Sequence, residues 1–149
     1  MYMSKIAKEN PHLLNKLSDR IKVEFTAKDM MQVLVGASIL AIPVALTEET
    51  WRLGQILPLQ NIFALMSLSF IFISIFTYFH YYTDKLHHYM GFYISRVIST
   101  YVLSFLIVAI LLTVIQKTPW TTDFLVAFKR TVIVSFPASL SGAIADTLK

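Results

Sequence analysis

Long runs of apolar residues without a single charge divide the chain. Residues 30–47, 62–83 and 97–116 contain no Asp, Glu, Lys or Arg. A helix of about 20 apolar residues crosses the roughly 30 Å hydrocarbon core of a bilayer. These three runs therefore predict three transmembrane helices.

A fourth apolar stretch is interrupted near its start. The uncharged run 131–145 is shorter, and Lys129 and Arg130 separate it from the apolar residues 124–128. Because lysine and arginine stems can extend from a helix end to the headgroups, we interpret about 124–146 as one spanning helix. The alternative is an interfacial segment followed by a short, tilted span.

The N-terminal arm, residues 1–29, is polar and basic. Apolar residues recur near helical spacing between positions 14 and 25, which predicts an amphipathic helix on the membrane surface. A short soluble helix packed against the rest of the protein is the alternative. Thr-Ala-Lys-Asp at 26–29 resembles a capping box, so a new helix is expected to start there. The predicted fold is an all-α membrane protein with this arm and a four-span domain at 30–149.

Composition supports the same fold class. Of the 149 residues, 56% are hydrophobic and 15% charged, and the mean hydropathy is +0.62. Soluble domains carry charge on roughly a quarter of their residues, so the lipid bilayer is the expected surrounding. The absence of cysteine excludes disulfides and thiolate chemistry. No phosphate-binding loop, nucleic-acid motif or catalytic signature occurs, so neither a nucleic-acid partner nor an enzyme is predicted.

Basic residues predict the orientation of the chain. Six Lys or Arg precede the first span, and Lys85 and Arg96 are expected in the loop between the second and third spans. Cytoplasmic segments of membrane proteins are enriched in such residues. We therefore expect a multi-pass protein of the cell membrane with both termini in the cytoplasm. Trp51 and Trp120 then lie together at the outer interface.

The first and last spans share a pattern of small residues and one proline. Small side chains at intervals of about four residues occupy one helix face and permit close packing. A proline inside a span frees a backbone carbonyl, which can coordinate a cation. The pattern therefore predicts either packing seams or a polar pathway. The small residues are Ala37, Ala41, Ala45, Ala138 and Gly142, and the prolines are Pro43 and Pro137.

Carboxylates stand at the ends of these two spans. Glu48 and Glu49 follow the first span, and Asp146 ends the fourth. In an oligomer, each mouth of a pathway could carry a ring of negative charge that favours cations. The candidate cation pathway therefore comprises these three carboxylates with Pro43 and Pro137. The alternative is that the carboxylates are simply solvated or paired with basic residues.

Two histidines and an aspartate form a candidate metal site. His80, Asp84 and His88 are spaced i, i+4 and i+8 and share one face if the helix of the second span continues. Imidazole and carboxylate ligands suit zinc, iron or manganese. The alternatives are an aromatic and polar interface belt or a pH-sensing role. A divalent metal is the one cofactor considered, and no other is predicted.

Two patches in the first and last spans carry a family resemblance. They are Gly36, Pro43, Thr47, Glu49 and Trp51, and the run Val-Ile-Val-Ser-Phe-Pro-Ala-Ser-Leu-Ser-Gly at 132–142. They resemble a family of prokaryotic integral membrane proteins of unknown function. The resemblance implies a polytopic membrane protein and assigns no activity, ligand or site.

The leading functional hypothesis is an oligomeric channel or transporter for small cations. Four packed helices leave no room for an aqueous lumen, so a route would run between subunits. The rival hypothesis is a non-catalytic structural or accessory subunit of a larger membrane complex. A metal-dependent membrane enzyme would require the histidine site to hold an ion.

Overall fold

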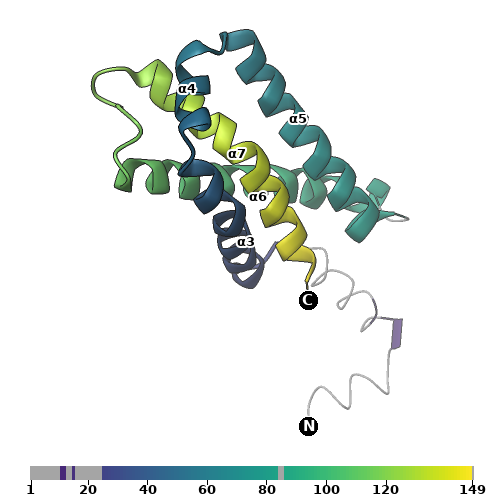
Figure 1. Ribbon diagram of the computed structural model, residues 1–149. Helices are drawn as coiled ribbons and strands as arrows, with labels where there is room; N and C mark the ends of the chain where they lie inside the picture. Colours follow the sequence, from purple (N-terminus) through teal and green to yellow (C-terminus); the bar gives the residue numbers. More distant parts are fainter. Residues whose placement is uncertain (1–10, 13–14, 16–24, 84–85, 149) are drawn as a thin grey trace.

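The computed structural model describes residues 11, 12, 15, 25–83 and 86–148 (Figure 1). All regular structure in these residues is helical. Four of the described helical segments are long and apolar enough to cross a membrane: Ala27–Ala45, Leu59–Tyr82, Tyr89–Val114 and Phe124–Thr147. The predicted all-α fold with four spans is therefore confirmed. The predicted amphipathic helix of the arm lies outside the described residues.

The first span is α3, Ala27–Ala45, and a capping box starts it. The amide of Asp29 donates to Thr26 Oγ1 at 3.4 Å, and the amide of Thr26 donates to Asp29 Oδ2 at 3.0 Å. The expected start at 26–29 is confirmed. The helix therefore includes Asp29, which lies outside the predicted span at 30–47.

A short helix that the sequence did not predict follows the first span. This helix, α4, comprises Glu48–Ile56 and contains both glutamates in its first turn. It leads to Pro58, whose extended backbone precedes the second span, α5, Leu59–Thr77. Only Leu57 and Pro58 therefore separate α4 from α5.

The second and third spans meet near the end at which α3 begins. Helix α5 passes into a π-helical turn, η1, Tyr78–Tyr82, and α6 comprises Leu86–Val114 with non-helical angles at Tyr89 (φ −126°, ψ 27°). Arg96 therefore lies within the third span. The expectation that Arg96 belongs to the connecting loop is wrong, because the helix begins well before the uncharged run.

The fourth span, α7, is one continuous helix, Phe124–Thr147. Asp123 caps it by accepting a hydrogen bond from the amide of Val126 at 3.1 Å. The interpretation of this stretch as one helix is confirmed, and how much of that helix lies in the membrane interface stays a prediction. Helix α7 packs against α3, α4, α5 and α6 and is the most buried of the four spans (Figure 1).

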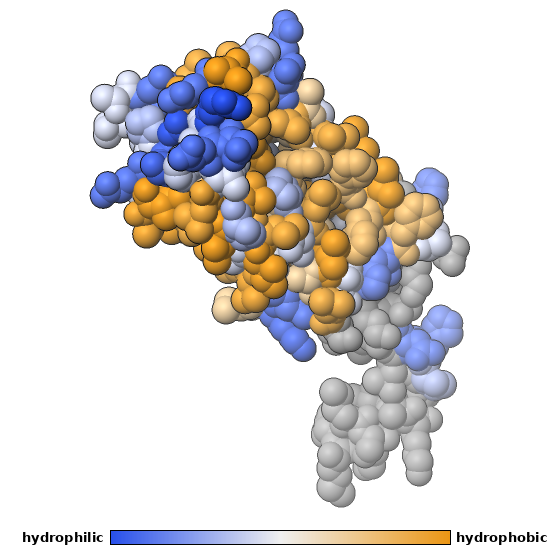
Figure 2. Space-filling model, viewed as in Figure 1, coloured by the Kyte–Doolittle hydropathy of each residue, from blue (hydrophilic) through white to orange (hydrophobic). Residues whose placement is uncertain are grey.

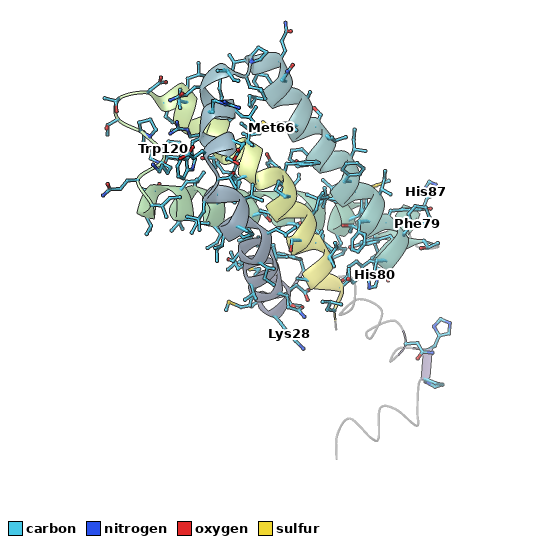
Figure 3. All side chains as sticks on the ribbon, in the orientation of Figure 1. Lys28, Met66, Phe79, His80, His87 and Trp120 are labelled. Atoms are coloured by element: carbon cyan, nitrogen blue, oxygen red, sulfur yellow. The ribbon has the colours of Figure 1, made fainter. Side chains whose placement is uncertain are left out.

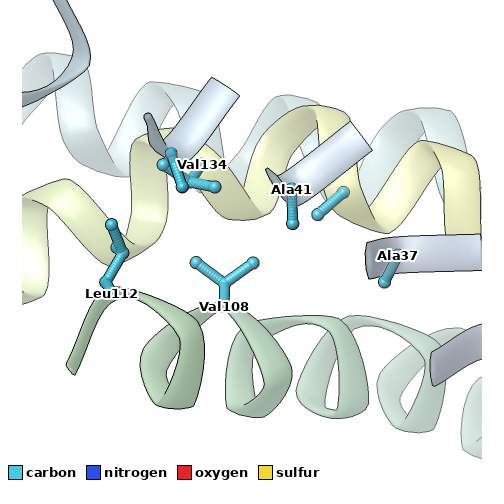
Figure 4. Close-up of a cluster of buried hydrophobic side chains, with 7 residues drawn as sticks. Ala37, Ala41, Val108, Leu112 and Val134 are labelled. Atoms are coloured by element: carbon cyan, nitrogen blue, oxygen red, sulfur yellow. The ribbon is translucent and has the colours of Figure 1, made fainter. Parts of the chain in front are cut away.

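The small residues of the first and last spans face each other within one chain. Figure 4 shows Ala37 and Ala41 of α3 beside Val134 of α7 and Val108 and Leu112 of α6. The predicted packing residues are all buried here: Ala37, Ala41, Ala45, Ala138 and Gly142. The backbones approach so closely that a Cβ on Gly36 would lie 2.3 Å from the Cβ of Ala145. Because this seam is filled, contacts between copies would need other surfaces.

The outer surface of the bundle is apolar around its middle and polar at its ends. Figure 2 shows a hydrophobic band between two hydrophilic regions, one over α4 and the segment before α7. Exposed aliphatic side chains such as Val35, Ile39 and Ile110 belong to this band. An apolar belt of this kind is what the hydrocarbon core of a bilayer covers.

Candidate functional site

A buried ion-pair cluster lies at the end of the bundle where α3 begins and α7 ends. The Arg96 guanidinium lies 2.5 Å from Asp146 Oδ2 through Nη1 and 3.2 Å from Asp29 Oδ2 through Nη2. The three residues are buried, and Arg96 has no exposed surface. We call Asp29, Arg96, Asp146 and the adjoining Tyr81 the Arg96 cluster. It connects three of the four spans through a single guanidinium.

Local structure explains why these groups meet. Asp29 is the third residue of α3, where the capping box fixes its carboxylate and where negative charge is favoured near a helix N-terminus. Asp146 lies in the last turn of α7, and the early start of α6 brings Arg96 between them. The antiparallel course of α3 and α7 thus places two carboxylates at the same end.

Tyr81 completes the cluster from the π-helical turn. Its ring centroid lies 4.2 Å from the Arg96 Cζ atom, and its hydroxyl donates to the backbone carbonyl of Asp146 at 2.8 Å. The Phe25 ring lies 5.3 Å from the same guanidinium carbon. A cation over an aromatic face is stabilised by the ring quadrupole. The guanidinium is therefore held by carboxylates at its edge and by aromatic rings at its faces.

The cluster restricts what its carboxylates can bind. Ionisable groups inside membrane spans are costly and usually mark ion routes, proton relays or paired charges. Here Asp146 and Asp29 share Arg96, so another cation can bind these carboxylates only by competing with the guanidinium. The arrangement can act as an ionic closure of this end or as a lock that holds the three spans together.

The other predicted carboxylates lie at the opposite end of the bundle. Glu48 and Glu49 are exposed in the first turn of α4 and line a surface hollow of about 270 Å³ with Trp51 and Arg52. The structure therefore separates these glutamates from Asp146 rather than bringing them together. Of the prolines, Pro43 is exposed and Pro137 is half-buried. The cation pathway through these five residues stays a prediction.

Arg130 of α7 holds α4 against the end of the bundle opposite the Arg96 cluster through hydrogen bonds. Its Nε donates to the Trp51 carbonyl at 3.1 Å, and its Nη1 donates to the Lys117 carbonyl at 2.5 Å. The Trp51 indole donates to the Ala45 carbonyl at 2.8 Å, and the Lys117 ammonium lies 3.9 Å from the Trp51 ring centroid. This end is thus held by hydrogen bonds to neutral carbonyl oxygens.

The candidate metal ligands do not share one helix. His80, labelled in Figure 3, is exposed on η1, and its ring stacks with that of Phe76. His88 belongs to α6, because η1 ends at Tyr82 and α6 begins at Leu86. Asp84 and the side chain of His88 lie outside the described residues. Within the described part of the chain, no three His, Asp or Glu side chains are grouped to hold a metal ion. Metal binding here stays a prediction.

Sequence reasoning missed Arg96 and Asp29 as site residues. Both stand next to an uncharged run and were assigned to its flanks. The available signal for Arg96 was the apolar and aromatic character of the residues before it, Met90 to Ile94. An arginine with apolar residues on both sides predicts a charge within a helix, as the structure shows.

Comparison with known proteins places the chain in a family. No curated protein and no solved structure matches it. The family model described as "Putative integral membrane protein (DUF2391)" matches residues 3–148, nearly the whole chain. This match confirms the resemblance found in the first and last spans. The chain, with its four apolar helices, therefore belongs to this family of integral membrane proteins.

Proposed function

We propose that the protein is an oligomeric channel or transporter for small cations in the cell membrane. The observation that carries the proposal is the fully buried guanidinium of Arg96, shared by Asp29 and Asp146. Ionisable groups inside membrane spans are costly, and those that occur commonly mark ion pathways. The Arg96 cluster holds together the helix ends beside one mouth of the proposed route.

The proposed mechanism is competition for the two carboxylates. Small hard cations prefer oxygen ligands, and the carboxylates of Asp146 and Asp29 are occupied by Arg96 in the closed state. A cation that displaces the guanidinium separates the ends of α3 and α7, which the cluster holds together. At the opposite end, the exposed Glu48 and Glu49 raise the local concentration of cations.

The route itself runs between copies of the chain. The faces of α3 and α7 that carry the small residues are filled by each other, so the interior of one chain is packed. Pro43 and Pro137 each leave a carbonyl without its helical donor. In the orientation that the basic arm predicts, the Arg96 cluster faces the cytoplasm and α4 faces outward. The proposal assigns the protein no reaction.

Flux through reconstituted protein tests the proposal. Purified protein in liposomes should pass K⁺ or Na⁺ faster than protein-free liposomes, as ion-sensitive dyes report. Asp146→Asn weakens the closure and should increase the flux, whereas a Glu48→Gln, Glu49→Gln double variant should lower it. Asp123→Asn is the matched control, because asparagine also caps a helix and the site lies far from the cluster. Flux equal to that of empty liposomes in wild type and Asp146→Asn would contradict the proposal.

A non-catalytic subunit of a larger membrane complex is the second candidate. Two observations favour it: the Arg96 cluster can serve as a lock within one chain, and α5 and α7 form an exposed groove of about 350 Å³ whose lining is entirely apolar. Such a groove, with Phe72, Phe76 and Ile144 in its walls, fits the helix of another membrane protein. Purification from the native membrane in mild detergent distinguishes the two. A partner at fixed stoichiometry supports the subunit, and a homo-oligomer supports the cation route.

A further inference from the structure

A second groove lies between α3 and α7 on the surface of the bundle. It has a volume of about 390 Å³, and we call it the α3–α7 groove. Its walls include Met31, Val35 and Ile39 of α3 and Leu148 after α7, and Gly36 lies at its floor. Lys28 and Gln32 stand at one end of it. Figure 3 shows Lys28 at the end of α3, remote from Trp120 at the other end of the molecule.

The groove is polar at one end and apolar along its length. Met31, Val35 and Ile39 are four residues apart, so they form one row that ascends α3 from Lys28. At 1.5 Å per residue, the helix rises about 16 Å from Lys28 to Ile39. That distance is close to half of the roughly 30 Å hydrocarbon core. The apolar row therefore matches the depth of a single lipid leaflet.

The polar end of the groove favours an anion. Lys28 is exposed and has no ion-pair partner within the part of the chain that the structure describes. The neighbouring carboxylate of Asp29 is bound to Arg96 in the interior, so it does not neutralise Lys28. The first turn of α3 adds the positive end of the helix dipole. The groove between α5 and α7, by contrast, has only apolar residues in its lining.

We propose that the α3–α7 groove binds a phospholipid with an anionic headgroup. The lipid phosphate lies at the Lys28 ammonium, and one acyl chain lies along Met31, Val35 and Ile39. Gln32 lies beside this site, where its Nε2 donates to the Leu148 carbonyl at 3.1 Å. Basic pockets between spans are a recognised way of binding anionic lipid headgroups. The bound lipid covers the seam where Gly36 approaches Ala145. This site is independent of the cation route proposed above.

Native mass spectrometry of delipidated protein tests the site directly. The protein is titrated with phosphatidylglycerol, with phosphatidylcholine of the same acyl chains, and with glycerol phosphate, which lacks acyl chains. One lysine at a membrane surface favours an anionic lipid by about fivefold, so phosphatidylglycerol should bind about fivefold more tightly than phosphatidylcholine. Glycerol phosphate that binds as tightly as phosphatidylglycerol would overturn the proposal in favour of a soluble anion.

Variants assign the binding to this groove. Lys28→Glu, and more mildly Lys28→Gln, should reduce phosphatidylglycerol binding to the level of phosphatidylcholine. Ile39→Trp should narrow the groove and weaken the binding of both phosphatidylglycerol and phosphatidylcholine. The controls are Arg52→Glu on α4 and Ile110→Trp on α6, which change an exposed charge and an exposed apolar residue elsewhere. The proposal would be overturned if the control variants lost as much phosphatidylglycerol binding, or if the Lys28 variants bound it unchanged. A protein bound in the groove in place of lipid would also overturn it.

Discussion

Removal of the Arg96 guanidinium is the most direct test of the buried cluster. Arg96→Met retains an unbranched apolar stem but leaves the carboxylates of Asp29 and Asp146 without this partner. Breaking a buried ion pair by deleting one side costs about 3–5 kcal/mol. The upper part of that range applies here, because one guanidinium serves two carboxylates at 2.5 and 3.2 Å and stacks 4.2 Å from the Tyr81 ring.

That free energy corresponds to a measurable change in melting temperature. For chains of this size, 1 kcal/mol shifts Tm by about 2–4 °C, so a loss of about 4–5 kcal/mol in Arg96→Met should lower Tm by about 8 to 20 °C. Thermal unfolding in one detergent, followed by the loss of the monodisperse peak in size-exclusion chromatography, measures it. Arg52→Met is the matched control, because Arg52 is exposed on α4 and surface changes usually stay within about 0.5 kcal/mol.

Second-site variants show whether the loss of stability in Arg96→Met has an electrostatic cause. In the Arg96→Met background, Asp29→Asn and Asp146→Asn remove the uncompensated charges and should restore much of the lost stability. The double-mutant cycle of Arg96→Met with Asp146→Asn then gives their coupling free energy. An Arg96→Met variant as stable as Arg52→Met, or one that neither asparagine rescues, would refute the reasoning.

Three further predictions concern packing and the α4 end. Gly36→Ala places a Cβ 2.3 Å from that of Ala145 and should destabilise the protein by about 1–3 kcal/mol. Gly91→Ala, with open space around it, should stabilise the protein by about 0.5–1 kcal/mol. Thermal unfolding compares the two variants, and equal effects would contradict close packing at Gly36. Trp51→Phe removes the indole hydrogen bond to α3 and should cost about 1 kcal/mol in the same assay. Arg130→Gln should accelerate hydrogen exchange of the α4 amides, since two carbonyl contacts are lost; unchanged exchange would argue against the fastening role.

The spans were predictable because hydrocarbon thickness imposes length and apolarity on each of them. Because length and apolarity are properties of consecutive residues, a short stretch of sequence is enough to recognise a span. It located α5 and the continuous α7, in which Lys129 and Arg130 precede the uncharged run. The capping box at Thr26 and Asp29 was readable for the same reason, since its two members are near neighbours.

The buried cluster was not predictable in this way because its members are distant in sequence. Arg96 pairs with Asp29 at a separation of 67 residues and with Asp146 at 50. The first three spans were bounded by their uncharged runs, so Asp29 and Arg96, which flank two of these runs, were excluded from the bundle interior in advance. The buried charge of Arg96 is compensated by carboxylates from two other helices. The sequence around Arg96 contains no information about those helices.

Two arginines of the described spans, the buried Arg96 and the half-buried Arg130, differ in what they bind. This difference indicates which end of the bundle can change its structure. Arg130 donates to the carbonyls of Trp51 and Lys117, which carry no charge and cannot be titrated or neutralised. Arg96 binds carboxylates, whose charge can be cancelled by a proton or shared with another cation. A change in conditions therefore alters the attraction at the Arg96 cluster while that at α4 stays the same. Because α7 is continuous between them, we expect any functional movement to open the helix ends around Asp146 and to leave the α4 end in place.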